Sequence, residues 1–375
     1  MSKQLNLPSI TTAFEQKGLN AAAIADKLAV SREAVSKWLN GESFPRPDKL
    51  LQLALLLELK LDQLVIKLAS DAEPVIAFRK RGACKTTEVH VARAKEMGRL
   101  LKPLVPYLPF DQFKRPATLK APTTDYYYLQ NLVKSIRHDM GIGESEPVDF
   151  RHLIKFFSSL QMVLIPVLWG AKDKHENALH IFLPDSTTTW VYLNLDVEIH
   201  DFKFWMAHEL GHGLAPQLTD DMAENFADAF AGALLFPDGL AKEAYDRILA
   251  QRTQAARIEL IKRIAEDNLI SPISVDYEIN HYAKAHNLAK VDLGKAIFGA
   301  AKNLSKGYYN VGEALFGNKS PDAKRYIELC GEAFDTPFFP TLKEYLLKED
   351  KGCGYIQAIL DIPLLDAKEI HSALV

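Results

Sequence analysis

The sequence of 375 residues has few cysteines, no long apolar run and no large excess of either charge. Its three cysteines, Cys84, Cys330 and Cys353, are widely spaced and form no CxxC pair, which argues against a disulfide framework and against a cysteine-based zinc site. The apolar run LLQLALLL near residue 50 ends at Glu58, far short of the roughly 20 residues that span a bilayer. We therefore expect no membrane span, and any metal must use other ligands.

The N-terminal residues MSKQLNLPSITTAF lack a basic stretch, an apolar export region and a small-residue cleavage site, so the sequence predicts a cytoplasmic protein. The 45 basic and 48 acidic residues give a net charge of −3. That balance argues against a chain coated with nucleic acid along its whole length, but it permits one DNA-binding module. The length fits two or three domains, and 48% hydrophobic residues are typical of a globular protein.

Hydrophobic periodicity predicts an α+β fold that is predominantly helical. Residues 1–70 are expected to form a bundle of about five helices, followed by a linker or irregular wrapping segment at 71–124, where five prolines lie between 103 and 122. The next predicted domain covers 125–290, and a helical region of unknown role covers 291–375. Within 125–290 we expect two early helices, strands at 161–168, 178–183 and 188–195, and helices at 202–214 and from about 220 to 237.

The segment AAAIADKLAVSREAVSKWLNG, residues 21–41, predicts two short helices joined by a turn at 29–31, which is helix-turn-helix spacing. Ser31 is placed to cap the second helix by accepting from the amide of Glu33 or Ala34, while Val35 and Trp38 fall on one buried face. The side chains that then face outward, near the N-terminal end of a helix that would enter the major groove, are Arg32, Glu33, Ser36 and Lys37.

This segment resembles the Xre family of helix-turn-helix domains. The matching residues are Ile24, Ala25, Leu28, Val30, Ser31, Val35, Ser36, Trp38, Gly41, Pro45 and the apolar helix from Leu50 to Leu57. The resemblance implies binding to operator DNA. Because helix-turn-helix proteins commonly bind two symmetry-related half-sites as dimers, it also predicts a homodimer. The bundle is also compatible with a dimerisation or protein-docking role, because residues 1–70 carry 9 basic against 7 acidic groups and Ala21–Ala23 offer no polar phosphate contact.

The pentapeptide His208-Glu209-Leu210-Gly211-His212 is an HExxH motif within an apolar helical segment. Residues at i and i+4 share one helix face, so both imidazoles can ligate one zinc ion. Glu209 lies beside them, where it can take a proton from a metal-bound water. A zinc site of this kind needs a third protein ligand and an open fourth position.

A second helix, which begins beyond Pro216, carries Glu224 and Asp228 at i, i+4 spacing. This arrangement suits Glu224 as the third ligand, with Asp228 accepting the free ring N–H of a ligating histidine. The predicted strand at 190–195 just ahead of the motif favours a zincin, in which a peptide substrate pairs with an edge strand. His281 and Tyr282 are weaker candidates for a second oxyanion donor, and no role is assigned to His175, His180 or His200.

The segment that contains this motif resembles the ImmA/IrrE family of metallopeptidases. The resemblance covers roughly residues 125–290 and includes VYLNL at 191–195, AHELGH, and ENFADAFAGALLFP at 224–237. It implies a zincin-like domain with one zinc ion held by His208, His212 and Glu224, and with Glu209 as general base. An Xre-like bundle followed by this domain is an architecture known in the family.

Two hypotheses about function follow. The first is a DNA-binding regulator with a zinc endopeptidase domain that cleaves a repressor-type or other regulatory protein in stress, prophage or defence control. The second is a non-proteolytic transcriptional regulator or antitoxin-like protein whose metal site is structural or sensory. The intact HExxH motif with a suitable third ligand favours the first.

Overall fold

The computed structural model describes residues 3–40, 43–67, 73–79, 88–110, 118–169, 178–317 and 319–375. The chain divides into two compact units, residues 1–72 and 73–375, and each is described by itself. The predicted fold class is confirmed, since a helical N-terminal region is followed by a mostly helical α+β region with a small mixed sheet. Gly41, His175 and parts of the predicted 71–124 segment lie outside the described residues.

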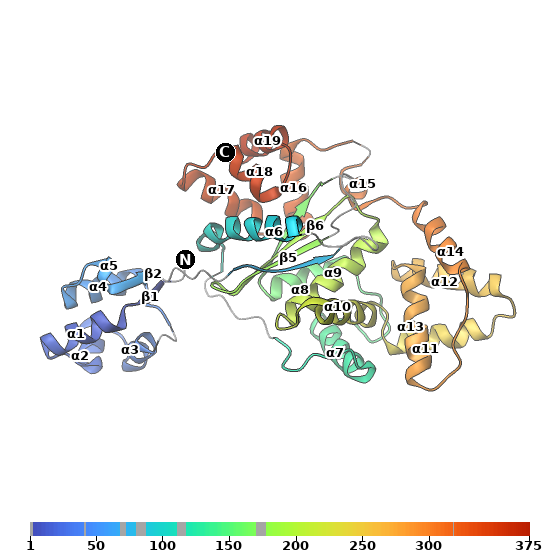
Figure 1. The fold of residues 1–375 in the computed structure, drawn as a ribbon, viewed down its shortest axis with the longest axis horizontal. Helices are drawn as coiled ribbons and strands as arrows, with labels where there is room; N and C mark the ends of the chain where they lie inside the picture. The colour runs from blue at the N-terminus through green and yellow to red at the C-terminus, as the bar shows by residue number, and fades with distance from the viewer. Residues whose placement is uncertain are drawn as a thin grey trace. The chain divides into compact units, whose positions relative to one another are not determined.

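In its described residues, the N-terminal unit contains five helices and a two-stranded sheet (Figure 1). The helices are α1 (Leu7–Lys17), α2 (Ala21–Leu28), α3 (Arg32–Leu39), α4 (Pro47–Leu57) and α5 (Leu61–Leu64). Strand β1 (Lys3–Leu5) pairs antiparallel with β2 (Val65–Lys67), so the unit begins and ends at the same small sheet. Ile10, Ile24 and Leu64 are fully buried in its core. The ammonium of Lys49 also donates to the carbonyl of Leu28 at 2.7 Å, which ties α4 to the end of α2.

The second unit contains a four-stranded sheet in the order β3-β5-β6-β4. Its strands are β3 (Val75–Arg79), β4 (Met162–Val167), β5 (Ala178–Leu183) and β6 (Thr188–Asn194). Only the β4–β6 pair is parallel. The helices are α6 (Glu88–Leu101), the 3-10 helix η1 (Lys102–Tyr107), α7 (Tyr126–Asp139), α8 (Phe150–Ser159), α9 (Ile199–Leu214), α10 (Asp220–Leu235), α11 (Asp238–Leu249), α12 (Gln254–Asn268), α13 (Pro272–Ala285), α14 (Ala296–Ser305), α15 (Val311–Phe316), α16 (Ala323–Phe334), α17 (Phe338–Lys348), α18 (Cys353–Leu360) and α19 (Leu364–Leu374).

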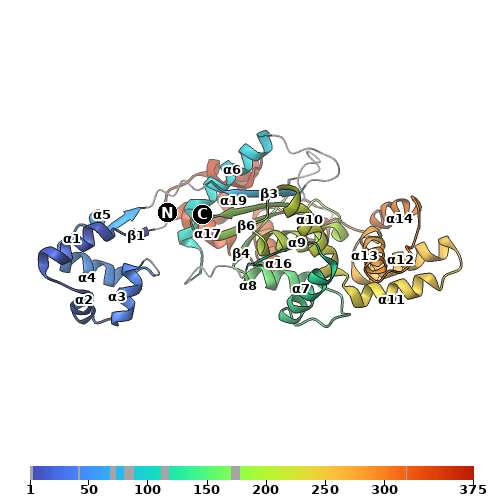
Figure 2. The ribbon, with the colours of Figure 1, turned by 60° about the horizontal axis from the view of Figure 1, so that its bottom comes forward.

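Helices cover both faces of this sheet (Figures 1 and 2). Helices α8, α9 and α10 lie on one side, while α6 and the C-terminal helices lie on the other. The side chains of β4 and β6 are buried along their whole length, as expected for strands that are covered on both faces. None of the helices in the described ranges combines the length and the apolar character that a bilayer-spanning helix needs.

The segment 71–124, predicted to be a linker or irregular wrapping segment, contains a strand and helices that the sequence analysis does not predict. Strand β3 pairs with β5, and α6 buries Ala94, Met97 and Leu101 in the core. A Cβ on Gly98 would lie 2.6 Å from the Cβ of Pro74, so glycine permits a close approach of α6 to the start of β3. The five prolines between residues 103 and 122 come after α6, and the first two, Pro103 and Pro106, lie in η1, so the described part of this stretch forms no single continuous helix.

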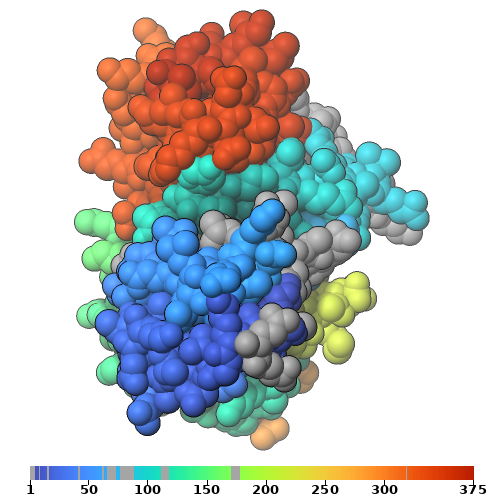
Figure 3. Space-filling model, turned by 90° about the vertical axis from the view of Figure 1, so that its left-hand side faces the viewer, coloured from blue at the N-terminus to red at the C-terminus, as the bar shows by residue number. Residues whose placement is uncertain are grey.

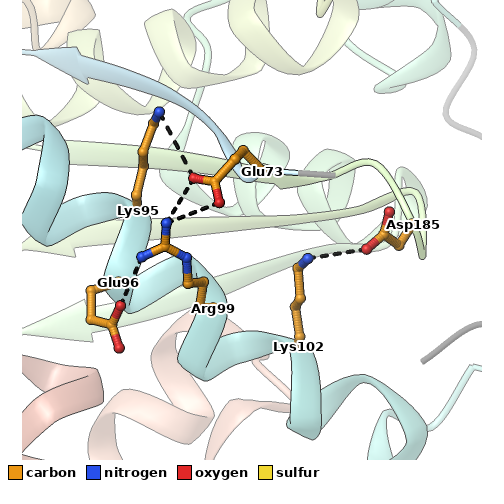
Figure 4. Close-up of polar contacts among 6 residues, drawn as sticks. All are labelled: Glu73, Lys95, Glu96, Arg99, Lys102 and Asp185. Carbon is orange, nitrogen blue, oxygen red and sulfur yellow. Dashed lines mark hydrogen bonds and ion pairs between the residues drawn. The ribbon is translucent and has the colours of Figure 1, made fainter. Parts of the chain in front are cut away.

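Surface ion pairs link α6 and the residue after it to Glu73 and to the turn between β5 and β6 (Figure 4). The carboxylate of Glu73 accepts from Arg99 at 2.9 Å and lies 3.8 Å from Lys95. Directly after the helix, Lys102 lies 3.1 Å from Asp185 in the turn between β5 and β6. Because most of these groups are exposed, the ion pairs add little to the stability of the fold, and the buried side of α6 matters more.

The C-terminal region, residues 291–375, shares the core of the second unit and closes one edge of its sheet. The hydroxyls of Tyr326 and Thr336 donate to the carbonyls of Pro166 and Leu164 in the edge strand β4. Trp169 donates to the carbonyl of Leu360 at 2.8 Å. Figure 3 shows these helices, in orange and red, seated against the teal surface around α6.

The expectation that the strand ahead of the HExxH helix offers an edge to a peptide is wrong. Strand β6 lies inside the sheet, between β5 and β4, and both of its sides are already paired. Sequence alone cannot order the strands of a sheet, because neighbours in space need not be neighbours in the chain. A peptide cannot pair with β6 without displacing a strand.

Helices α9 and α10 pack closely against each other, and a glycine allows their approach. A Cβ on Gly211 would lie 2.9 Å from the Cα of Ala227 and 3.2 Å from the Phe230 ring. Because the nearest atom belongs to the backbone, it cannot rotate away as the end of a flexible side chain could. The separation of the two helices is therefore set by the absence of a side chain at residue 211.

We predict that Gly211→Ala lowers the free energy of unfolding of the second unit by about 1–3 kcal/mol, because the added methyl forces α9 and α10 apart. Urea unfolding followed by tryptophan fluorescence measures this change. Gly299→Ala is the matched control, since no atom lies within 4 Å of a Cβ there and alanine improves helix propensity. Equal stability of the Gly211 variant and wild type would contradict the packing argument.

Candidate metal centre and DNA interface

Helix α9 places two histidines side by side in the interior of the second unit. His208 and His212 are separated by one helical turn, and their side chains are 0% and 6% exposed. Their Nε2 atoms are 2.9 Å apart. Two ring nitrogens in such proximity repel each other when both carry lone pairs, so an ion or a proton between them is needed to stabilise this arrangement.

Glu224 on α10 completes the group. One of its carboxylate oxygens lies 3.5 Å from Nε2 of His208, and the other lies 3.3 Å from Nε2 of His212. One ligand atom of each of the three residues lies within 4.8 Å of the others. Bonds of ~2.0–2.1 Å to a tetrahedral zinc ion would place such atoms about 3.3 Å apart, close to these separations. The triad therefore fits an HExxH-type zinc site.

Asp228 lies one turn after Glu224 and contacts the opposite nitrogen of the first ligand. Its carboxylate is 2.9 Å from Nδ1 of His208, so in the neutral imidazole that metal binding requires, Nδ1 donates to Asp228 and the Nε2 lone pair faces the triad. Burial lowers the pKa of His208, but the carboxylates of Asp228 and Glu224 outweigh it and raise that pKa to about 9. Burial raises the pKa of Glu224, but both histidines outweigh it and hold that pKa well below its usual range.

Glu209 is the remaining charged residue of the motif, and it is 1% exposed. It faces a residue to which the sequence reading assigned no role. Nδ1 of His180, on β5, lies 3.5 Å from Oε2 of Glu209, and the His180 ring centroid lies 5.8 Å from that of His212. Burial lowers the pKa of His180, and the carboxylate of Glu209 opposes this shift. No sequence signal links residues 180 and 209, because their contact depends on how α9 packs against the sheet.

The other polar residues considered from the sequence have packing partners of their own. His281 is paired with Glu278 at 3.3 Å, and the ring of Tyr282 lies 4.4 Å from that of His286. Their role as oxyanion donors stays a prediction. His200, in the first turn of α9, is 2% exposed and packs edge-on against Tyr308 with ring centroids 4.4 Å apart.

The N-terminal unit has the local features that were predicted for a helix-turn-helix. Ala29, at the end of α2, adopts a left-handed conformation with φ of 50°, which turns the chain. The Ser31 hydroxyl accepts from the amide of Ala34 at 3.1 Å and so caps α3. On α3, Val35 and Trp38 are 2% and 8% exposed, which confirms that they face the core.

The four residues predicted to contact DNA are all exposed on α3, and they are Arg32, Glu33, Ser36 and Lys37. The ammonium of Lys37 lies 2.8 Å from the carboxylate of Glu33 one turn earlier. This pair offsets part of the positive charge of the helix, and Lys37 holds the pKa of Glu33 below its usual range. Among the residues that the structure describes, Arg32 is the α3 cation that lies outside this pair.

Comparison with known families agrees with this geometry. Residues 10–64 match the model of the family described as Helix-turn-helix, so these residues form an Xre-type domain. A helix-turn-helix domain implies DNA binding. No curated protein matches the chain closely enough to count as a relative.

We predict that purified wild-type protein retains about one zinc ion per chain after desalting, and that His212→Ala retains less than a tenth of that amount, because two ligands do not hold zinc firmly. Elemental mass spectrometry measures the ratio. His138→Ala is the control, since the His138 side chain is 90% exposed outside the triad. Loss of zinc from this control, or retention by His212→Ala, would place the metal elsewhere.

Proposed function

We propose that the protein is a DNA-binding regulator whose second unit is a zinc-dependent endopeptidase. The observation that carries this proposal is the convergence of His208, His212 and Glu224 beside a buried glutamate of the same motif. Three protein ligands leave one position of a tetrahedral zinc ion free, which is typical of catalytic rather than structural sites. One ion per chain and Asp228 as the partner of the ligand His208 belong to the same proposal.

Each residue has a separate task in the proposed reaction. Bound zinc would supply Lewis-acid polarisation of the peptide carbonyl and a lowered pKa for water. His208, His212 and Glu224 hold the metal, and Asp228 fixes the tautomer and orientation of His208. Glu209 takes the proton from the attacking water and passes it to the leaving amine.

The link to the N-terminal domain supports a regulatory protein as substrate. A helix-turn-helix domain in the same chain would concentrate the peptidase at operator DNA, where repressors are bound. A homodimer on a near-palindromic site follows from the two-fold geometry of such readers. We propose a repressor-type regulator as the protein that is cut.

We predict that Glu209→Gln lowers peptide cleavage by about 10²–10⁴-fold and leaves the zinc content unchanged, because glutamine keeps the shape of the side chain but cannot accept the proton. The substrates are a proteome-derived peptide library and the purified transcription regulators encoded in neighbouring genes. New N-termini are counted by mass spectrometry. Equal cleavage by both proteins, or no cleavage by zinc-loaded wild type, would overturn the peptidase and favour a regulator with a structural or sensory metal.

We predict that Arg32→Ala weakens binding to the DNA upstream of the protein's own coding sequence by about 5–100-fold, as expected for loss of one base or phosphate contact. A gel shift at low salt measures the affinity. Lys60→Ala is the charge-matched control, because Lys60 precedes α5 in the same unit and is exposed away from α3. Equal losses in both variants, or no shift with wild type, would favour the docking role.

A further inference from the structure

Two buried polar atoms in the second unit face each other without forming a hydrogen bond. They are Nδ1 of His180 and Oε2 of Glu209, which lie 3.5 Å apart. In the part of the chain that the structure describes, neither atom has a hydrogen-bond partner. The two side chains are 5% and 1% exposed, so water does not reach these atoms freely. Such unpaired atoms are rare in folded proteins and often mark a functional requirement.

The backbones that carry the two side chains are both fixed. His180 lies in an inner strand, where it is opposite Ala77 of β3 and Val191 of β6. Glu209 lies in the middle of the 16-residue helix α9. A hydrogen bond between nitrogen and oxygen is usually 2.7–3.2 Å long. A small side-chain rotation that moves Nδ1 and Oε2 closer by a few tenths of an ångström would therefore form one here.

The absence of a side chain at Gly213 leaves space beside α9 for the His180 ring. A Cβ on Gly213, one turn after Glu209, would lie 2.7 Å from Cε of Met162 and 3.9 Å from Cε1 of His180. Glycine at 213 therefore leaves room for both side chains beside the helix. Because an uncharged imidazole carries one N–H, a carboxylate oxygen opposite Nδ1 selects the tautomer in which Nδ1 holds that proton.

We propose that His180 is a positioning residue for Glu209. Its Nδ1–H donates to Oε2 and holds the carboxylate in one rotamer, so that Oε1 alone accepts and releases the proton of the reaction. Without this bond the buried carboxylate has no partner for Oε2 and turns between rotamers. The inference rests on the proposed peptidase function, and it adds a residue outside the HExxH motif to the reaction site.

Side-chain replacements at residue 180 separate this role from simple packing. Phenylalanine keeps a ring but removes the donor, asparagine places an amide N–H close to the position of Nδ1, and glutamine places one close to Nε2. We expect His180→Phe to lower kcat by ~10–100-fold with KM within about twofold, the size of effect found when the partner of a catalytic or ligating group is lost. His180→Asn should recover most of kcat, and His180→Gln should not.

The assay uses the library peptide that wild type cuts fastest, and the zinc content of each variant is measured alongside. Unchanged kcat in His180→Phe, or equal kcat in the asparagine and glutamine variants, would overturn the positioning role. Loss of zinc from His180→Phe together with lower kcat would assign His180 to the metal site and equally overturn it.

A second measurement needs no substrate and no replacement of His180. In zinc-free wild type labelled with ¹⁵N-histidine, long-range ¹H–¹⁵N correlation reports which ring nitrogen of His180 carries the proton. We expect Nδ1–H, and we expect Glu209→Gln to shift this signal while the signal of the exposed His138 stays in place. The Nε2–H tautomer in wild type would overturn the proposal. This result stands even if no peptide is cut, so it separates failure of the inference from failure of the proposed function.

Discussion

The contact between α9 and α10 is the constraint on which the site depends. The ligand atoms of His208 and His212 come from one helix, and that of Glu224 comes from the other, so their separations of 3.3 and 3.5 Å follow from the distance between the helix axes. Gly211 sets that distance against the backbone at Ala227. Bringing a carboxylate next to two buried rings costs desolvation energy, and hydrophobic packing along the rest of the helix pair offsets it.

Buried polar groups occur in two different states around this contact. Some have a hydrogen-bond partner, as with Lys203, whose ammonium donates to the carbonyl of Asn268 at 2.6 Å while burial lowers its pKa to about 8. Others, such as His180 and Glu209, face each other unpaired. The paired groups hold the helices in place. The unpaired groups leave a hydrogen-bond donor and an acceptor unsatisfied next to the triad. Because the unpaired groups lie beside the triad, we infer that they take part in the chemistry of the site.

Local spacing explains what could be predicted from the sequence. The pairs His208–His212 and Glu224–Asp228 share helix faces at i, i+4, and helical periodicity with the Pro216 break separated the two helices. Strands at 162–167, 178–183 and 188–194 also stood out by their β-branched runs. What could not be predicted depends on tertiary contacts. His180 meets Glu209 only through the packing of α9 on β5, β3 joins the sheet across a gap of about a hundred residues, and the order of the strands left β6 without a free edge.

The hydroxyls that cover β4 also hinder the pairing of this sheet edge with a strand of another chain. Carbonyls along an uncovered edge strand can template the addition of a strand from another chain. Tyr326 and Thr336 occupy those of Pro166 and Leu164, yet both lie more than 150 residues later in the sequence. During synthesis, β4 therefore emerges long before its own cover exists. A nascent or truncated chain that ends before α16 therefore exposes the edge of β4 to aggregation. The last fifth of the molecule protects the sheet of its own chain from this intermolecular pairing.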